Sequence, residues 1–264
     1  MEKVYLGTNT KMYKGLADTV SYVEELCRLT ADLPREKLEL FVIPSFIALD
    51  AARKSADQKL LRLGGQNMGW AEEGPYTGEI SPRMLLECGA TIAELGHSER
   101  RHVLGETDEM VNRKVLCAVE HGLTALLCIG ETAEEKEKGL ADEVLQMQLK
   151  RGLYQLPPPT GEQLWVAYEP VWAIGEQGVP ATKEYAEERH RTIRRTLVQL
   201  FGEERGAQIP LLYGGSVNPE NAVGLIQMEH IDGLFIGRSA WDAPRFSQLI
   251  RSVLDVCFPK ETML

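Results

Sequence analysis

Residues 90–129 read ATIAELGHSERRHVLGETDEMVNRKVLCAVEHGLTALLCI. Two short apolar runs, Ala90–Leu95 and Ala125–Ile129, flank a stretch with helical periodicity, Asp108–His121. A strand, an amphipathic helix and a second strand form a βαβ unit, whose two strands lie parallel in one sheet. The near-continuous apolarity of both runs is typical of strands that are covered on both faces. This stretch therefore predicts an α/β fold with a parallel sheet.

The same alternation extends over the whole chain. Eight apolar runs are expected to be strands: Val4–Thr8, Leu38–Ile43, Leu60–Gly64, Ala90–Leu95, Ala125–Ile129, Leu164–Ala167, Ile209–Tyr213 and Ile231–Ile236. Helices are expected between them, for example at Leu16–Leu29, Asp108–His121, Lys183–Phe201 and Asn218–Gln227. Eight units in 264 residues match the ~250 residues of a closed (β/α)8 barrel. We predict a single (β/α)8 TIM barrel domain over residues 1–264.

Composition argues against several classes of partner. The chain has 29 Lys and Arg against 39 Asp and Glu, a formal charge of −10, which opposes binding to nucleic acid and to anionic membranes. The five cysteines are scattered without a C-x-x-C pair, so neither a disulfide framework nor a zinc site is expected. Apolar runs such as Leu123–Ile129 are too short to cross a bilayer, and the start, residues 1–4, lacks a signal pattern. We expect a soluble, cytoplasmic protein.

Polar residues that follow the predicted strands are the candidates for chemistry, because barrel enzymes build their sites from the loops at the carboxyl ends of the strands. Strand one leads to Lys11, strand four to His97 and strand six to Glu169. Glycine-rich turns follow strands seven and eight, at 214–216 and 237–239. Backbone N–H groups in such turns bind anions. These features together predict acid–base chemistry on a small phosphorylated substrate.

Each feature taken alone has a structural explanation. A strand-end Lys or Glu is usually solvated or ion-paired, and a lone His97 could be a structural histidine; only their joint placement favours a site. Four arginines on one predicted helix alternate with acidic residues, which favours a solvated face and no site: Arg189, Arg191, Arg194 and Arg195, with Glu187 and Glu188.

At these positions the sequence resembles the triosephosphate isomerase family, over essentially the whole chain and in the correct order. The matching segments are Asn9-x-Lys11-Met12, Gly74–Ile80, Glu94–Arg101, Cys128–Glu131, Ala167–Gly175 and Tyr213–Val217. The resemblance implies an intramolecular oxidoreductase, an aldose–ketose isomerase that interconverts dihydroxyacetone phosphate and D-glyceraldehyde 3-phosphate in glycolysis and gluconeogenesis. It also implies that no metal or organic cofactor is required.

The resemblance assigns roles to five side chains. Glu169 is expected to be the general base, which moves a proton between neighbouring carbons through an enediolate. His97 is expected to be a neutral electrophile, because it precedes a helix whose positive end disfavours the imidazolium. Lys11 is expected to supply positive charge to the substrate oxygen and the phosphate, and Asn9 to add a hydrogen bond. Glu99 is expected to support Lys11.

The resemblance also implies binding contacts and a partner. The backbone amides of Gly175, Ser216 and Gly237 are expected to bind the phosphate. Residues 170–172 and the residues after Gly175 resemble the hinges of a mobile loop that closes over it. Thr77 is expected to contact the active site of a second subunit, which implies a symmetric homodimer.

Three departures from the family pattern touch this site. Residues 176–180 make the closing loop one residue longer. Arg238 replaces a glycine, so that it either points outward, or adds charge or reshapes the pocket. Thr10 and Tyr13 stand where the family usually has Trp and Asn. These departures resemble a branch that isomerises L-erythrulose 1-phosphate to D-erythrulose 4-phosphate. Because the catalytic set is retained, we rank the triose phosphate first and the tetrulose phosphate second.

Two other classes of function are weaker alternatives. A Schiff-base aldolase on the same barrel would use Lys11 but would not need the His97 and Glu169 segments. A non-catalytic sugar-phosphate sensor would bind phosphate without proton exchange at the substrate carbon.

Overall fold

A closed barrel of eight parallel strands forms the centre of the protein. The computed structural model describes residues 2–175 and 178–259. The strands are β1 (Val4–Asn9), β2 (Leu38–Ile43), β3 (Arg62–Gly65), β4 (Ala90–Leu95), β5 (Thr124–Ile129), β6 (Leu164–Tyr168), β7 (Leu211–Tyr213) and β8 (Gly233–Phe235). Each strand pairs with the next in the chain, and β1 closes the barrel by pairing with β8. The predicted (β/α)8 barrel is confirmed.

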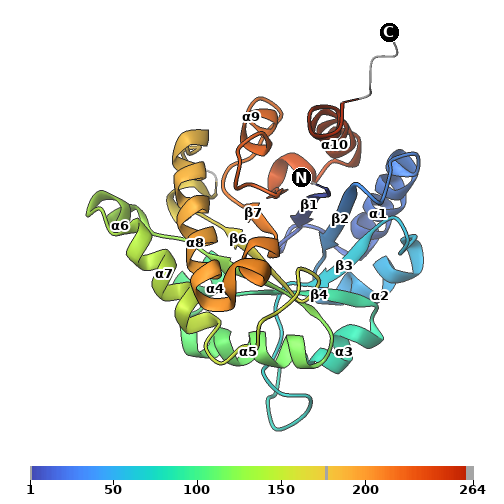
Figure 1. Ribbon diagram of the computed structural model, residues 1–264. Coiled ribbons are helices and arrows are strands. Elements are labelled where there is room, and N and C mark those ends of the chain that lie inside the picture. The colour runs from blue at the N-terminus through green and yellow to red at the C-terminus, as the bar shows by residue number, and fades with distance from the viewer. Residues whose placement is uncertain (1, 176–177, 260–264) are drawn as a thin grey trace.

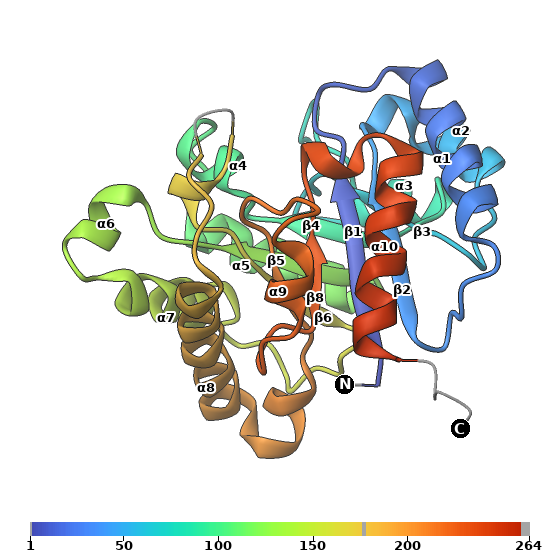
Figure 2. The same ribbon diagram turned by 90° about the horizontal axis from the view of Figure 1, so that it is seen from above.

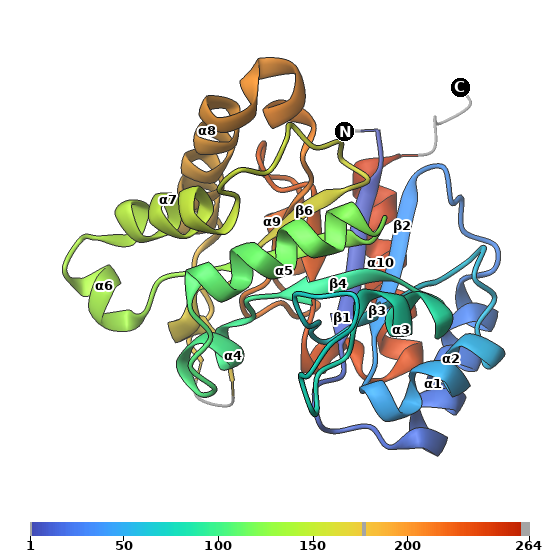
Figure 3. The ribbon, with the colours of Figure 1, turned by 90° about the horizontal axis from the view of Figure 1, so that it is seen from below.

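Helices surround the strands (Figure 1). They are α1 (Leu16–Thr30), α2 (Phe46–Ser55), α3 (Pro82–Glu87), α4 (Ser98–His102), α5 (Asp108–Glu120), α6 (Ala133–Glu137), α7 (Ala141–Gly152), α8 (Lys183–Gln208), α9 (Ala222–Ile226) and α10 (Ala243–Cys257). Two short 3₁₀ turns, η1 (Val171–Ala173) and η2 (Arg238–Ala240), follow β6 and β8. Views from above and below show α4 at the end of the barrel to which β1 runs, the carboxyl end of the strands (Figures 2 and 3).

The core has two layers, as a closed barrel requires. Apolar side chains on the outer face of the strands pack against the helices. A second cluster fills the barrel interior, and its aromatic members are Phe41, Trp165 and Phe235. The rings of Phe41 and Phe235 stack with their centroids 5.7 Å apart. Such a filled interior confines the chemistry to the rim of the barrel.

Two predicted helices end differently from the expectation. The prediction Lys183–Phe201 covers only the first part of α8, because Gly202 interrupts the helix with a φ of +82° and a second helical stretch follows. The prediction Asn218–Gln227 starts too early. The Asn218 side chain accepts hydrogen bonds from the backbone N–H groups of Glu220 and Asn221, so a local turn precedes α9.

The predicted solvated face of α8 is wrong for two of its four arginines. Arg189 is buried and pairs with Asp142 at 3.3 Å. Arg194 donates to Asp232 Oδ2 at 2.7 Å and to two backbone carbonyls, and its burial lowers the pKa of its guanidinium. Both side chains therefore tie α8 to neighbouring elements, whereas Arg191 and Arg195 are exposed as expected.

Within residues 2–175 and 178–259, every helix is too short or too polar to span a lipid bilayer.

Candidate active site

A cavity of about 440 Å³ opens at the carboxyl ends of the strands. Every residue predicted to act on the substrate lines it: Asn9, Lys11, His97, Glu99, Glu169, Gly175, Ser216, Gly237 and Arg238. They come from the ends of β1, β4, β6, β7 and β8. The barrel therefore brings together in one cavity side chains that are far apart in the sequence.

Lys11 follows β1 in an unusual backbone conformation, with a φ of +50°. Its ammonium Nζ donates to Glu99 Oε1 at 2.6 Å, and its backbone N–H donates to Asn9 Oδ1 at 2.6 Å. Left-handed conformations of residues other than glycine are sparsely populated and cluster at functional sites. These bonds hold the charge of Lys11 at the rim of the cavity.

His97 is the N-cap residue of α4. Its Nδ1 accepts a hydrogen bond from the backbone N–H of Glu99 at 3.2 Å. An Nδ1 that accepts this bond carries no proton, so the neutral ring carries its proton on Nε2. Nε2 lies 3.5 Å from Glu169 Oε1 and faces the cavity. His97 can therefore donate a hydrogen bond to a substrate oxygen.

Glu169 directly follows β6 and is almost fully buried. Its Oε2 accepts the backbone N–H of Ser98 at 3.2 Å. A Cβ atom at Gly130 would lie 1.9 Å from the Glu169 carbonyl oxygen, and one at Gly214 would lie 2.9 Å from Glu169 Cγ. Gly130 therefore leaves room for the backbone of Glu169, and Gly214 leaves room for its side chain.

Backbone amides and one arginine form the opposite side of the cavity. Gly175 has a φ of +91°, and Gly237 precedes the turn η2. Arg238 is exposed but does not point away, because its Nη2 donates to the carbonyl oxygen of Gly175 at 3.1 Å. The predicted outward orientation is therefore not the one observed, and Arg238 is among the residues that line the cavity.

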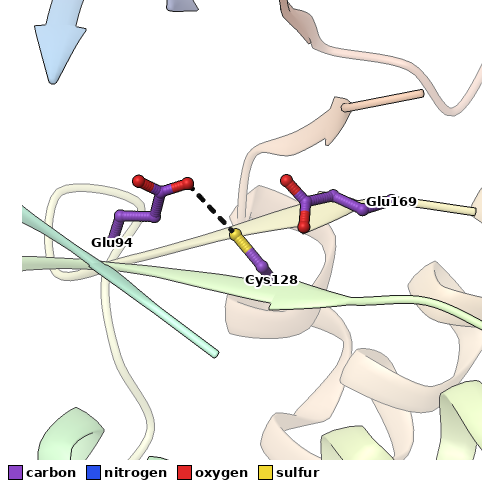
Figure 4. A group of neighbouring side chains, drawn as sticks. All are labelled: Glu94, Cys128 and Glu169. Carbon is purple, nitrogen blue, oxygen red and sulfur yellow. Dashed lines mark hydrogen bonds between the residues drawn. The ribbon is translucent and has the colours of Figure 1, made fainter. Parts of the chain in front are cut away.

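Two residues beneath the cavity were given no role by the sequence analysis. Glu94 and Cys128 are fully buried on the inner face of β4 and β5. Figure 4 shows the Cys128 thiol between the carboxylates of Glu94 and Glu169. Burial raises the pKa of Glu94 from 4.5 to about 7; nearby His97 opposes this shift and Glu169 adds to it. Burial also raises the pKa of Cys128 well above its ordinary value.

Glu131 is a third residue without an assigned role. Its Oε1 accepts hydrogen bonds from Tyr168, Trp172 and Tyr185 at 2.8 to 3.0 Å. Burial, followed by the charge of Glu131, raises the pKa of both tyrosines. Since Trp172 belongs to η1, this network fixes the first turn after Glu169.

An aromatic pair forms another wall of the cavity. Tyr13 lies against Trp241, with ring centroids 4.6 Å apart, and both rings line the cavity. Trp241 Nε1 donates to the carbonyl oxygen of Asn9 at 3.0 Å. Thr10, the other departure near Lys11, is fully buried. Trp241 was not singled out from the sequence, because its contacts with Tyr13 and Asn9 join segments that are far apart in the chain.

Comparison with known proteins identifies the family. Residues 4–253 match the family model described as "Triosephosphate isomerase". The chain belongs to the triosephosphate isomerase family. The family predicted from the motifs is confirmed, and the chain is an enzyme of the isomerase class.

Several curated relatives carry a narrower name within this family. The chain is 45% identical to an L-erythrulose-1-phosphate isomerase of Rhizobium etli, over 98% of this chain and 97% of the relative. It is 44% identical to proteins of the same name from Rhizobium meliloti and Brucella abortus, over 95% of this chain and 96% of each relative. Among solved structures, the chain matches the crystal structure of the triosephosphate isomerase of Bartonella henselae, with a TM-score of 0.85 over 97% of this chain and 99% of that one. The two sequences are 35% identical.

Two further predicted features of this triosephosphate isomerase family member are the segment around Thr77 and the lengthened loop after Gly175. Thr77 is exposed on the segment 66–81, which projects beyond α3 and α5 (teal, lower edge of Figure 1). In the lengthened loop, residues 176 and 177 lie outside the described residues. The backbone N–H of Val179 donates to the Trp172 carbonyl at 3.3 Å, which joins the far side of the loop to η1.

Among the described residues, two groups of side chains have the composition of a metal site, and one of them contains Glu169. Glu94, Cys128 and Glu169 each place one ligand atom within 4.8 Å of the others (Figure 4). Hydrogen bonds already engage one oxygen of each carboxylate, from Asn9 and from Ser98. An ion at this position would occupy the expected base, Glu169.

Proposed function

We propose that this family member is an L-erythrulose-1-phosphate isomerase, which forms D-erythrulose 4-phosphate. The observation that carries the proposal is the name shared by curated relatives at 44 to 45% identity over nearly the full chain, against 35% for the triosephosphate isomerase structure. Departures at Thr10, Tyr13 and Arg238 support it as marks of the resemblance to this branch, and Tyr13 lines the cavity. The proposal reverses the order of the two substrates that the sequence favoured.

The two substrates differ at the carbon that reacts. L-Erythrulose 1-phosphate is dihydroxyacetone phosphate with a hydroxymethyl group added to the carbon that loses its proton. This group therefore lies at the Glu169 end of the cavity, away from the phosphate. One such group changes discrimination by about 1–3 kcal/mol, so a few substitutions suffice to shift the preference.

The reaction moves a carbonyl group by one carbon without an external oxidant. Glu169 removes the proton from C3, and the electron pair forms the C2–C3 double bond of an enediolate. The hydroxyl proton at C3 is transferred to the oxygen at C2, and Glu169 returns its proton to C2. The negative charge develops on the two oxygens, where donors held in place beforehand stabilise it most.

Three side chains around Glu169 supply that stabilisation. His97 donates from Nε2, and the Asn9 amide and the Lys11 ammonium add a hydrogen bond and positive charge. Glu99 holds Lys11 through the 2.6 Å bond to Nζ. The phosphate is held by the backbone amides at Gly175, Ser216 and Gly237 and by the guanidinium of Arg238.

The deciding measurement compares substrates on the purified enzyme. We expect kcat/KM for L-erythrulose 1-phosphate to exceed that for dihydroxyacetone phosphate or D-glyceraldehyde 3-phosphate by at least about 10-fold, in line with the cost of one misplaced hydroxymethyl group. Turnover should survive EDTA, because the predicted mechanism needs no metal.

Other outcomes support other functions. A large preference for the triose phosphates would make the enzyme a triosephosphate isomerase. Tight phosphate binding without exchange of the substrate proton in D₂O would support the sensor. Covalent trapping of substrate on Lys11 by borohydride would support the aldolase.

We further propose a homodimer in the cytoplasm. Large apolar side chains near the cavity are exposed in the single chain: Met12 is 97% and Ile47 80% exposed. Exposed apolar groups of this kind mark interaction surfaces. All five cysteines are free, which suits a reducing compartment.

A further inference from the structure

Glu94 is a carboxylate in the apolar interior of the barrel. Side chains alternate along β4, so that Glu94 shares the inner face with Ile92, a member of the interior apolar cluster. The side chain of Glu94 has no exposed surface. Burial of a carboxyl group is costly unless hydrogen bonds compensate for the lost water. Its position therefore calls for a specific partner.

That partner is the Asn9 side chain, which lines the cavity. Asn9 Nδ2 donates to Glu94 Oε2 at 2.7 Å, and both side chains are buried. The other carboxylate oxygen lies 4.0 Å from Cys128 Sγ, a weak donor. Glu94 is not among the residues that line the cavity, whereas Asn9 is, so the hydrogen bond to Asn9 connects Glu94 to the cavity.

The Asn9 amide is held at both ends. Its Oδ1 accepts the Lys11 backbone N–H at 2.6 Å and Gln66 Nε2 at 3.0 Å. In the flipped rotamer, Oδ1 would face the Glu94 carboxyl group and Nδ2 would face the two donors. Glu94 therefore selects the amide orientation that keeps the nitrogen on its own side. An amide nitrogen has two hydrogens, so one remains for the cavity.

We propose that Glu94 is a positioning residue for the isomerisation, which holds the Asn9 amide so that its second N–H meets the substrate oxygen. The inference rests on the proposed function, because it assigns Asn9 the developing enediolate as its acceptor. Donors aimed at such an oxygen are most effective when their orientation is fixed before the charge develops.

A double-mutant cycle tests this role. We expect Glu94→Leu to lower kcat about 10- to 100-fold, with little change in KM. The upper end of this range is the effect of losing one hydrogen-bond donor to the developing oxyanion. In an Asn9→Ala background the same substitution should change kcat less than about 2-fold, because the group it positions is already absent. Glu94→Gln keeps a carbonyl oxygen that can accept the hydrogen bond from Asn9. Its kcat should stay within about 5-fold of the wild type, since a hydrogen bond to a neutral acceptor is only moderately weaker than one to a charged acceptor.

Cys128→Ala is the matched control. It disturbs the interior beside the second oxygen of Glu94 but removes no contact of Asn9, so kcat should fall much less than in Glu94→Leu. Equal losses from Glu94→Leu with and without Asn9 would overturn the proposal, because Glu94 would then act independently of the amide. A Glu94→Gln variant that is folded and as impaired as Glu94→Leu would also overturn it.

A spectroscopic readout separates this proposal from the proposed function. With ¹⁵N-labelled asparagine, the Asn9 side-chain amide can be assigned from the signal that Asn9→Ala lacks. Its two protons should be distinct in the wild type and in Glu94→Gln, and should shift and exchange faster in Glu94→Leu. An unchanged signal in Glu94→Leu overturns the positioning role even if the enzyme is active. A held amide in a protein without turnover overturns the proposed function and, with it, the use of Asn9 in catalysis.

Discussion

Glu169 Oε1 lies 3.5 Å from His97 Nε2. The two residues follow β6 and β4, and β5 lies between those strands in the barrel. The backbone N–H of Ser98, the residue after His97, binds the other oxygen of Glu169. A base and a hydrogen-bond donor are thus fixed at the ends of two strands separated by one other strand, with room for a substrate on their cavity side.

Shortening the base should impair chemistry and not binding. Glu169→Asp retracts the carboxylate by roughly 1 Å, and a misplacement of that size lowers turnover by about 100-fold. We expect kcat to fall by at least that factor with KM changed less than about 3-fold, since the phosphate contacts lie elsewhere. Steady-state kinetics with L-erythrulose 1-phosphate measures both constants.

The control for this change is Glu162→Asp. Glu162 is exposed just before the amino end of the same strand, β6, far from the cavity. It should leave both constants unchanged. Wild-type turnover in Glu169→Asp would remove Glu169 from the role of general base.

Removal of the imidazole should slow the same step. His97→Gln removes the Nε2 donor, and loss of one donor to a developing oxyanion costs about 100-fold in kcat. His102→Gln, an exposed position at the end of the same short helix α4, should have no effect. If the two substitutions were equivalent in kcat, His97 would not be the electrophile.

The positions of His97 and Glu169 could be predicted from the sequence for a topological reason. In a barrel whose strand order follows the chain, every strand end meets the same rim, so the residues after the apolar runs converge. The same logic found Asn9, Lys11 and the glycine turns. The conformation of the Arg238 side chain could not be predicted from the sequence, because its hydrogen bond to the Gly175 carbonyl joins two loops from different parts of the chain.

Glu94 and Arg194 show where the sequence was insufficient. Glu94 stands in an apolar run with the period of the inner face, which is a usable signal, but its bond to Asn9 depends on how β1 and β4 face each other across the barrel. Arg194 lies among alternating charges, a pattern typical of a solvated face. Its partner Asp232 precedes β8, so the burial of Arg194 depends on tertiary packing that local charge patterning does not encode.

Arg238 should contribute equally to both candidate substrates. The phosphate is common to them, whereas the additional hydroxymethyl group lies at the Glu169 end. We expect Arg238→Ala to raise KM about 10-fold for L-erythrulose 1-phosphate and for dihydroxyacetone phosphate, the value of one hydrogen bond to a charged group. The ratio of the two kcat/KM values should stay constant.

Arg245→Ala removes the same charge from an exposed position in the first turn of α10 and serves as the control. A change in the substrate ratio in Arg238→Ala would instead make Arg238 a determinant of specificity.

The proposed homodimer depends on the exposed segment around Thr77. A charged side chain introduced at Thr77 should therefore disrupt the dimer. Thr77→Arg would bury an unpaired guanidinium if this segment inserts into a second subunit, which is strongly unfavourable. We expect sedimentation to show dimers for the wild type and monomers for Thr77→Arg, with a loss of activity. Ser252→Arg, at an exposed position on α10, should remain dimeric; monomeric wild-type protein at micromolar concentration would contradict the proposed assembly.

The buried carboxyl of Glu94 should make stability depend on pH. Its pKa is raised by burial from 4.5 to about 7, while His97, Glu169 and Lys11 supply the nearby charges. Between these two values the folded state keeps a proton that the unfolded chain releases. The free energy of unfolding contributed by this group is therefore largest below pH 4.5, falls as the pH rises to about 7 and then levels off.

Glu94→Gln removes this titration but keeps the size of the side chain. Denaturant unfolding at one protein concentration should show the variant gaining stability relative to the wild type as the pH rises from 5 to 8. The exposed Glu162→Gln should instead run parallel to the wild type over that range. A constant difference between Glu94→Gln and the wild type from pH 5 to 8 would mean that Glu94 does not change its charge there. The carboxyl would then face Asn9 in a single protonation state throughout the working range of the enzyme.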